Sequence, residues 1–257
     1  EIELALGAPA ARLTRSNGTL SVEVARQDSR FISLIDLNTR LQRDERMRQA
    51  LRLPAMAVLG IDSEGVPLLL RLSSPDVAHC LIAGTTGSGK TELARTLIAS
   101  LLMHQKPRDL QIALFDPKGY SFSSFAHAPH LMFPIVKTAD EALSHAHRLV
   151  AEMERRDADV STNTQGIERP RVVIVIDELA DLMHMCGSEL EILLTRLAQR
   201  GRSAGFSLIA CTQKPAARII GSLVKANFPV RLVGRVASAD DARVAAGIGG
   251  TDAVKLA

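Results

Sequence analysis

The chain is short of several residue types. Its 257 residues include three cysteines, one tyrosine and no tryptophan, and aromatic side chains make up 3% of the total. Because Cys80, Cys186 and Cys211 are odd in number and far apart, they form no disulfide framework and instead indicate buried thiols in a reducing compartment. So few aromatic rings disfavour single-stranded or base-specific nucleic-acid binding, which relies on stacking platforms.

Long apolar runs and a strong excess of one charge are also missing. The longest uncharged apolar stretches, such as residues 97–103 and 172–176, are far shorter than the roughly 20 residues that cross a bilayer. The net charge of +3 permits nucleic acid as a partner without requiring it. The chain begins Glu1-Ile2-Glu3 with no leader, so we expect a segment of a longer cytoplasmic protein, with any membrane tether outside it.

What is present is the composition of a globular protein, with 46% apolar and 23% charged residues. Residues 1–53 are rich in arginine, and their patterns predict a strand over 20–24 and a helix over 36–52. Two short apolar runs around a turn cluster predict a hairpin over residues 55–72.

After residue 76, apolar runs of five or six residues alternate with helical patterns, which is typical of βα units around a parallel sheet. Five buried strands are predicted, at residues 79–83, 111–115, 172–176, 207–211 and 230–234. Helices are predicted near residues 91–103, 139–155, 189–199 and 219–226.

A phosphate-binding loop follows the first of these strands. The segment matches the pattern G-x-x-x-x-G-K-[ST] between a predicted strand and a predicted helix. Its backbone N–H groups and the helix N-terminus suit the phosphates of a nucleotide, with Lys90 on the β- and γ-phosphates and Thr91 as a Mg²⁺ ligand. The alternatives are a glycine-rich turn or a site that binds nucleotide without hydrolysis. The expected nucleotide-binding residues are Gly84, Thr85, Thr86, Gly87, Ser88, Gly89, Lys90 and Thr91.

Two carboxylates, Asp177 and Glu178, directly follow the apolar run 172–176. They should therefore lie at the carboxyl edge of the sheet, where ligands of open α/β sheets bind. We expect Asp177 to hold Mg²⁺ and Glu178 to act as the general base that polarises the attacking water. This pair favours ATP hydrolysis. The alternative is a helix N-terminus with acidic residues that suit its dipole.

Two further predictions concern the strand over 207–211. Gln213 follows it, where the amide would sense the γ-phosphate or orient water; the alternative is a solvent-facing loop residue. Arg196, Arg200 and Arg202 precede it at a helix end, where cations suit the helix dipole. One of them would reach the nucleotide of a neighbouring subunit, with Arg202 as the first choice and Arg200 as the second.

Taken together, these motifs resemble the motor domain of the FtsK/SpoIIIE family of DNA translocases, within the RecA-like ATPases. The resemblance covers about residues 54–246, with Asp157 and Lys214 as departures from the family's usual Tyr and Arg. It is carried by HCLIAGTTGSGKT (79–91), DPK (116–118), PHL (129–131), EMERR (152–156), DELADLM (177–183), RLAQRGR (196–202), TQKP (212–215) and LVKANFP (223–229).

The expected fold class is α/β: a RecA-like P-loop NTPase core with a mainly parallel sheet flanked by helices, plus a small α+β N-terminal subdomain. Residues 1–53 would form that subdomain and residues 54–257 an ATPase motor domain truncated at its C-terminus. The resemblance implies a hexameric ring that hydrolyses ATP with Mg²⁺ and moves double-stranded DNA, in chromosome partition at cell division or in mobile-element transfer. Contacts would be to the phosphate backbone and non-specific in sequence.

Two other functions remain open at this point. The same family fold serves protein secretion systems, and such a module would bind a peptide signal and respond little to DNA. A regulatory module that uses nucleotide as an assembly signal is disfavoured by Lys90, Asp177 and Glu178, since it needs no base. Four arginines are DNA-contact candidates by charge and position, although a solvated basic loop explains each of them as well: Arg155, Arg156, Arg169 and Arg171.

Overall fold

The structure is a computed structural model, which describes residues 11–16, 19–24, 31–62, 64–161, 169–213, 223, 227–247 and 252–254. The chain divides into two compact units, residues 1–39 and 40–257. In the first, β1 (Ala11–Ser16) and β2 (Thr19–Val24) pair antiparallel. The second compact unit therefore begins at residue 40, before residue 54. The division into domains between residues 53 and 54 remains a prediction.

The single helix predicted over residues 36–52 is wrong, because two helices occupy this stretch. They are α2 (Leu34–Arg43), which crosses the boundary between the units, and α3 (Glu45–Leu51). Asp44 separates them: its backbone is extended, and its carboxylate accepts hydrogen bonds from the backbone N–H groups of Arg46 (2.8 Å) and Met47 (3.3 Å). An aspartate in this conformation caps a new helix and interrupts the old one.

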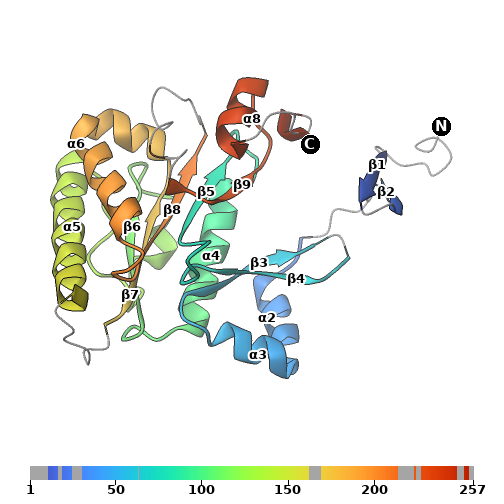
Figure 1. Cartoon of the computed structure of the whole chain (residues 1–257), viewed down its shortest axis with the longest axis horizontal. Helices are drawn as coiled ribbons and strands as arrows, with labels where there is room; N and C mark the ends of the chain where they lie inside the picture. The colour runs from blue at the N-terminus through green and yellow to red at the C-terminus, as the bar shows by residue number, and fades with distance from the viewer. Residues whose placement is uncertain are drawn as a thin grey trace. The chain divides into compact units, whose positions relative to one another are not determined.

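The second unit is built on a five-stranded parallel sheet in the order β6-β7-β8-β5-β9 (Figure 1). The five predicted strands and the α/β class are therefore confirmed. The strands are β5 (His79–Ala83), β6 (Leu110–Phe115), β7 (Arg171–Ile176), β8 (Phe206–Thr212) and β9 (Val230–Val233). The helices are α4 (Lys90–His104), α5 (Ala139–Ser161), α6 (Leu179–Arg200) and α8 (Ala239–Ala246), with 3₁₀ turns at Ser123–Phe125 and Asp252–Val254.

Each face of the sheet has its own hydrophobic core. On one face, alternate strand residues such as Ile174 and Leu208 pack with α5 and α6, which lie side by side in Figure 1. On the other face, their neighbours Val175 and Ile209 pack with α4 and with the predicted hairpin, β3 (Met56–Ile61) and β4 (Pro67–Arg71). Because both faces are covered, the strands read as continuous apolar runs in the sequence.

Two helices of this unit differ from the sequence expectation. α6 begins ten residues earlier than the predicted residue 189, directly after Glu178, and Gly187 interrupts it with a left-handed φ of 68°. α8, which was not predicted, begins after Ser238, whose side chain accepts a hydrogen bond from the backbone N–H of Asp241. The helix predicted over residues 219–226 lies almost wholly outside the described residues.

The cysteines are free thiols, and two of the three are buried as expected. Cys80 and Cys211 lie in the sheet, and burial raises the pKa of Cys80 to about 12, while Cys186 on α6 is partly exposed. Within the part of the chain that the structure describes, no helix is both long and apolar enough to cross a membrane.

Candidate active site

The predicted phosphate loop connects β5 to α4 at the carboxyl edge of the sheet (Figure 1). Gly87 and Gly89 have left-handed φ angles of 82° and 86°, which glycine adopts without strain. A Cβ on Gly84 would lie 2.4 Å from the Ser88 Oγ, so the loop closes on itself too tightly for another residue there. Lys90, the first residue of α4, is 7% exposed. The loop therefore has the tight turn and the helix N-terminus that hold phosphate groups.

Asp177 lies beside this loop at the end of β7. One carboxylate oxygen accepts a hydrogen bond from the Ser121 hydroxyl (2.6 Å), and the other lies 3.5 Å from the Thr91 hydroxyl. A carboxylate and a hydroxyl facing each other are oxygen ligands of the kind that Mg²⁺ takes together with water and phosphate. The structure thus brings together the two residues that the sequence assigned to the metal, and their chemistry fits it.

Glu178 is buried, with 3% of its surface exposed, and its backbone is left-handed (φ 63°, ψ 70°). For a residue with a side chain that conformation costs about 1 to 3 kcal/mol, and α6 begins at the next residue. The carboxylate accepts hydrogen bonds from the Thr212 hydroxyl (3.0 Å) and from the backbone N–H of Gln213 (3.0 and 3.1 Å). Burial raises the pKa of Glu178, and these two hydrogen bonds oppose the shift.

Gln213 joins the phosphate loop to this carboxylate. Its side-chain oxygen accepts a hydrogen bond from the Thr86 hydroxyl (2.8 Å), while its backbone N–H binds Glu178. The strand order explains the contact, because β8 lies between β5 and β7 and ends between their two functional segments. Gln213 thus contacts both the phosphate loop and Glu178.

The comparisons with known proteins agree with this geometry. The profile of the FtsK/SpoIIIE family matches residues 37–168 and 158–217. A DNA translocase FtsK of Listeria monocytogenes is 32% identical over 278 residues, and a DNA translocase SftA of Bacillus subtilis is 32% identical over 270 residues. Both alignments cover 98% of this chain. The chain belongs to the FtsK/SpoIIIE family.

This FtsK/SpoIIIE chain spans about a third of the length of these relatives, 35% of the first and 28% of the second. Among solved structures, the conjugation coupling protein TcpA of pCW3 superposes with a TM-score of 0.72 at 21% identity, over 98% of this chain and 72% of TcpA. The type VII secretion ATPase EccC of Thermomonospora curvata gives 0.65 at 24% identity, over 79% of this chain and 26% of EccC. These likenesses show the fold, and family and fold together class the chain as a nucleotide-using P-loop ATPase.

The sequence analysis missed three side chains that hold the two acids of the FtsK/SpoIIIE site. Thr212 and Ser121 donate to Glu178 and Asp177, and the Lys118 ammonium lies 3.9 Å from Glu178. Lys118 and Ser121 come from the loop after β6. The buried Asp116 shapes this loop by accepting hydrogen bonds from the backbone N–H groups of Gly119 and Phe122, both at 3.0 Å. The sequence feature that could have identified these residues is their position at or after the end of a buried strand.

The three candidate arginines of α6 and its C-terminal end do not join this site within one chain. Arg196 pairs with Glu154 (2.8 Å) and Arg200 with Asp157 (2.6 Å). Arg202 is exposed and, among the described residues, has no ion pair. It precedes β8, so it lies at the amino edge of the sheet, opposite the phosphate loop. Of the three, Arg202 is the cation left unpaired for another molecule.

Three of the four candidate DNA-contact arginines form ion pairs within the chain. Arg155 and Arg156 both bind Glu152, at 2.8 and 2.7 Å, and Arg156 is buried. Arg169 pairs with Asp159 at 2.5 Å. Burial lowers the pKa of Arg171, whose side chain is at the start of β7. Ion pairs within the chain therefore explain the positions of Arg155, Arg156 and Arg169 without a DNA contact.

The hydrogen bond from Thr212 gives a first testable prediction. As the expected general base, Glu178 has to be ionised, and the Thr212 hydroxyl favours the ionised form. In Thr212→Val the pKa of Glu178 therefore rises further, and the acid limb of the pH–rate profile moves to higher pH. We expect kcat on that limb to fall by about tenfold or more, the worth of a hydrogen bond to a charged group, with KM for ATP unchanged.

Thr212→Ser is the matched control, because it keeps the hydroxyl and should keep the wild-type profile. The measurement is the steady-state ATPase rate from pH 5 to 9. A Thr212→Val profile that overlays the wild type would show that the hydroxyl does not support the base.

Proposed function

We propose that this chain is the ATP-hydrolysing motor module of a double-stranded DNA translocase and works as a hexameric ring. The observation that carries the proposal is that Lys90, Thr91, Asp177 and Glu178 all lie at the carboxyl edge of the sheet, in a family whose similar curated members are named DNA translocases. The names of these relatives indicate DNA as the cargo.

The chemistry follows from the contacts. Lys90 and the loop N–H groups bind the β- and γ-phosphates, while Thr91 and Asp177 hold Mg²⁺, which neutralises charge on the phosphates when bound. Glu178 accepts the proton of the attacking water, and its raised pKa makes it a better base than an exposed carboxylate. Gln213, which accepts a hydrogen bond from Thr86, contacts the γ-phosphate. Its backbone hydrogen bond to Glu178 then couples binding of the γ-phosphate to that carboxylate. Arg202 would act on the nucleotide of the next subunit.

The proposed DNA contact is to the phosphate backbone. A net charge of +3 and 3% aromatic residues suit charge-based binding better than stacking or base readout. Such binding releases counterions, so that with about six to ten phosphate contacts the affinity falls about 10³- to 10⁵-fold between 50 and 200 mM salt. This steep dependence is the signature of contact with the phosphate backbone.

The test is the ATPase rate with and without long duplex DNA across a salt series. We expect DNA to stimulate the wild type, the stimulation to fade with salt, turnover to be lost in Lys90→Ala, and turnover to fall about a hundredfold or more in Glu178→Gln. Turnover that depends on Lys90 but ignores DNA would overturn the DNA cargo and favour the protein-export function, whose ATPases share the fold. Turnover that survives both substitutions would overturn the site itself.

A further inference from the structure

The loop that follows β6 is held at four consecutive residues. The Asp116 carboxylate accepts hydrogen bonds from the backbone N–H groups at both ends of residues 119–122, each at 3.0 Å. Arg95 of α4 donates to the two carbonyl groups between them, from Nε to Ser121 (2.6 Å) and from Nη2 to Tyr120 (3.4 Å). An acid at the end of β6 and an arginine from α4 therefore fix this loop together.

Arg95 belongs to the helix that follows the phosphate loop. It lies four residues after Thr91, so both side chains are on the same face of α4. Its remaining nitrogen, Nη1, pairs with Glu92 at 2.6 Å. A guanidinium has its N–H groups in a fixed fork and can meet two carbonyl groups and a carboxylate at once. All three nitrogens of Arg95 thus have partners within the chain.

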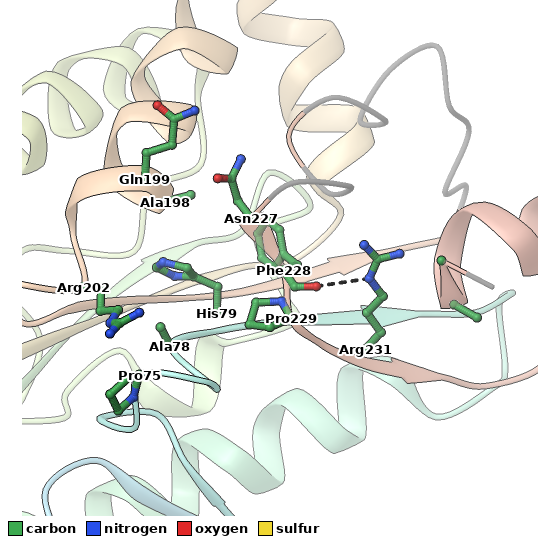
Figure 2. Close-up of a pocket in the computed structure, with 12 residues that line it drawn as sticks. Pro75, Ala78, His79, Ala198, Gln199, Arg202, Asn227, Phe228, Pro229 and Arg231 are labelled. Atoms are coloured by element: carbon green, nitrogen blue, oxygen red, sulfur yellow. Dashed lines mark hydrogen bonds between the residues drawn. The ribbon is translucent and has the colours of Figure 1, made fainter.

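Figure 2 shows another arginine that holds backbone carbonyl groups, at the opposite, amino edge of the sheet. Arg231 donates from Nε to the Phe228 carbonyl (3.1 Å), beside a pocket of about 570 Å³. Its Nη1 also donates to the carbonyl groups of Val244 and Ala245 (3.3 and 3.5 Å). Arginines therefore hold backbone segments at both edges of this sheet. What distinguishes Arg95 is the side chain that its loop carries.

Ser121 connects this loop to the candidate metal site. Its hydroxyl donates to one oxygen of Asp177 (2.6 Å), and both residues are 2% exposed. A short hydrogen bond to an ionised carboxylate is strong, so it fixes the orientation of Asp177. The other oxygen of Asp177 lies 3.5 Å from the hydroxyl of Thr91, its expected partner in binding Mg²⁺. Because Arg95 holds the carbonyl group of Ser121 itself, a displacement of the loop would move this hydroxyl.

We propose that Arg95 is a positioning residue for the Mg²⁺ site, an inference that rests on the proposed function. It holds the loop so that the Ser121 hydroxyl stays on Asp177, and this hydrogen bond directs the second Asp177 oxygen toward the metal beside Thr91. Groups that orient metal ligands typically contribute about 10- to 100-fold to metal affinity or activity. Because Arg95 and Thr91 share one helix, the same contacts hold the phosphate loop and Asp177 in a fixed relation.

The test measures how strongly Mg²⁺ tightens the binding of a fluorescent ATP analogue to the full chain. The dissociation constant is determined in EDTA and in saturating Mg²⁺, and the ratio of the two is the Mg²⁺ factor. By linkage, this factor falls in proportion to the Mg²⁺ affinity of the nucleotide complex. Arg95→Gln loses the fork and the charge but keeps a helix-forming side chain, and we expect it to lower the factor about tenfold or more. Its binding in EDTA should equal that of the wild type, which shows that the variant is folded.

Glu92→Gln is the matched control. It removes the other partner of Arg95 and keeps both contacts to the loop, and an exposed ion pair contributes little, so the Mg²⁺ factor should stay at the wild-type value. Ser121→Ala removes the hydrogen bond to Asp177 and should also lower the factor. The double variant Arg95→Gln/Ser121→Ala should be no worse than Ser121→Ala alone, because both changes act on one hydrogen bond.

Three results would overturn the inference. A Mg²⁺ factor in Arg95→Gln equal to that of the wild type shows that Arg95 does not orient the metal site. Equal loss of binding with and without Mg²⁺ shows that Arg95 only supports the fold, and losses that multiply in the double variant show an action that bypasses Ser121. A wild type without a Mg²⁺ effect, or with one that Asp177→Ala leaves unchanged, contradicts the metal site of the proposed function, and the inference falls with it.

Discussion

Replacement of Glu178 by Gln is expected to lower kcat for ATP hydrolysis by about 10² to 10⁴-fold, which is the usual contribution of a positioned general base. The amide keeps the size of the carboxylate, and its oxygen can still accept from the Thr212 hydroxyl and the Gln213 N–H. What it loses is the ability to take a proton from water. Single-turnover and steady-state ATPase rates measure the effect.

Nucleotide binding should survive this substitution. Glu178 does not contact the phosphate loop directly, so we expect saturating ATP to stabilise Glu178→Gln as it does the wild type, by about 2.7 kcal/mol at a hundred times Kd. Because burial of the charged carboxylate raises its pKa and therefore costs free energy, the neutral amide should not lower the stability of the folded chain. Thermal unfolding with and without nucleotide checks both expectations, and Lys90→Ala serves as the control that loses binding.

A Glu178→Gln variant that keeps a tenth or more of the wild-type rate would contradict the assignment of the base. So would a variant that loses ATP-induced stabilisation together with turnover, because that result describes a binding residue. The two measurements therefore separate the roles of Lys90 and Glu178, which the sequence motifs alone had only suggested.

The sequence predicted the components of this site because parallel strands end at one edge. A glycine-rich loop after one buried strand, two acids after a second and an amide after a third must then lie close together. The sheet confirms this for β5, β7 and β8. The strand order was not derivable from the apolar runs, and it is the insertion of β8 between β5 and β7 that lets Gln213 touch both Thr86 and Glu178.

The supporting side chains could not be predicted in the same way. Ser121 and Thr212 bind the acids through single hydroxyl groups, and nothing distinguishes these hydroxyls in the sequence from other Ser and Thr residues. The left-handed backbone of Glu178 has no sequence signal either, since non-glycine residues rarely adopt it. Such strained positions are decided by tertiary contacts, and they concentrate at functional sites.

Two helix predictions went wrong for local reasons. Asp44 lies inside an amphipathic pattern that continues on both sides, so the pattern predicted one helix where the aspartate caps a second. The helix predicted near residues 189–199 is the second part of α6, which is helical on both sides of Gly187 and is interrupted there. In both cases one residue changes the backbone direction while the apolar periodicity around it persists.

Arg202→Ala is expected to lower kcat by about 10³-fold or more if Arg202 stabilises the transition state of the neighbouring nucleotide, as trans-acting arginines do. Arg202 lies at the amino edge of the sheet and the phosphate loop at the carboxyl edge, so its reach to a nucleotide requires a second subunit. Arg200→Ala is the matched control, because Arg200 already pairs with Asp157. Loss of that exposed pair should change the rate by no more than about fivefold.

Mixing two inactive variants tests the action between subunits directly. Arg202→Ala subunits keep a complete hydrolytic site, and Glu178→Gln subunits keep the arginine. Mixed as monomers in equal amounts before nucleotide is added, they should assemble with about a quarter of their interfaces intact, and ATPase activity should return. An arginine that acts within its own chain, or only on the fold, gives no recovery on mixing. Since neither variant is active alone, any returned turnover must arise at an interface where one copy supplies Glu178 and the next supplies Arg202.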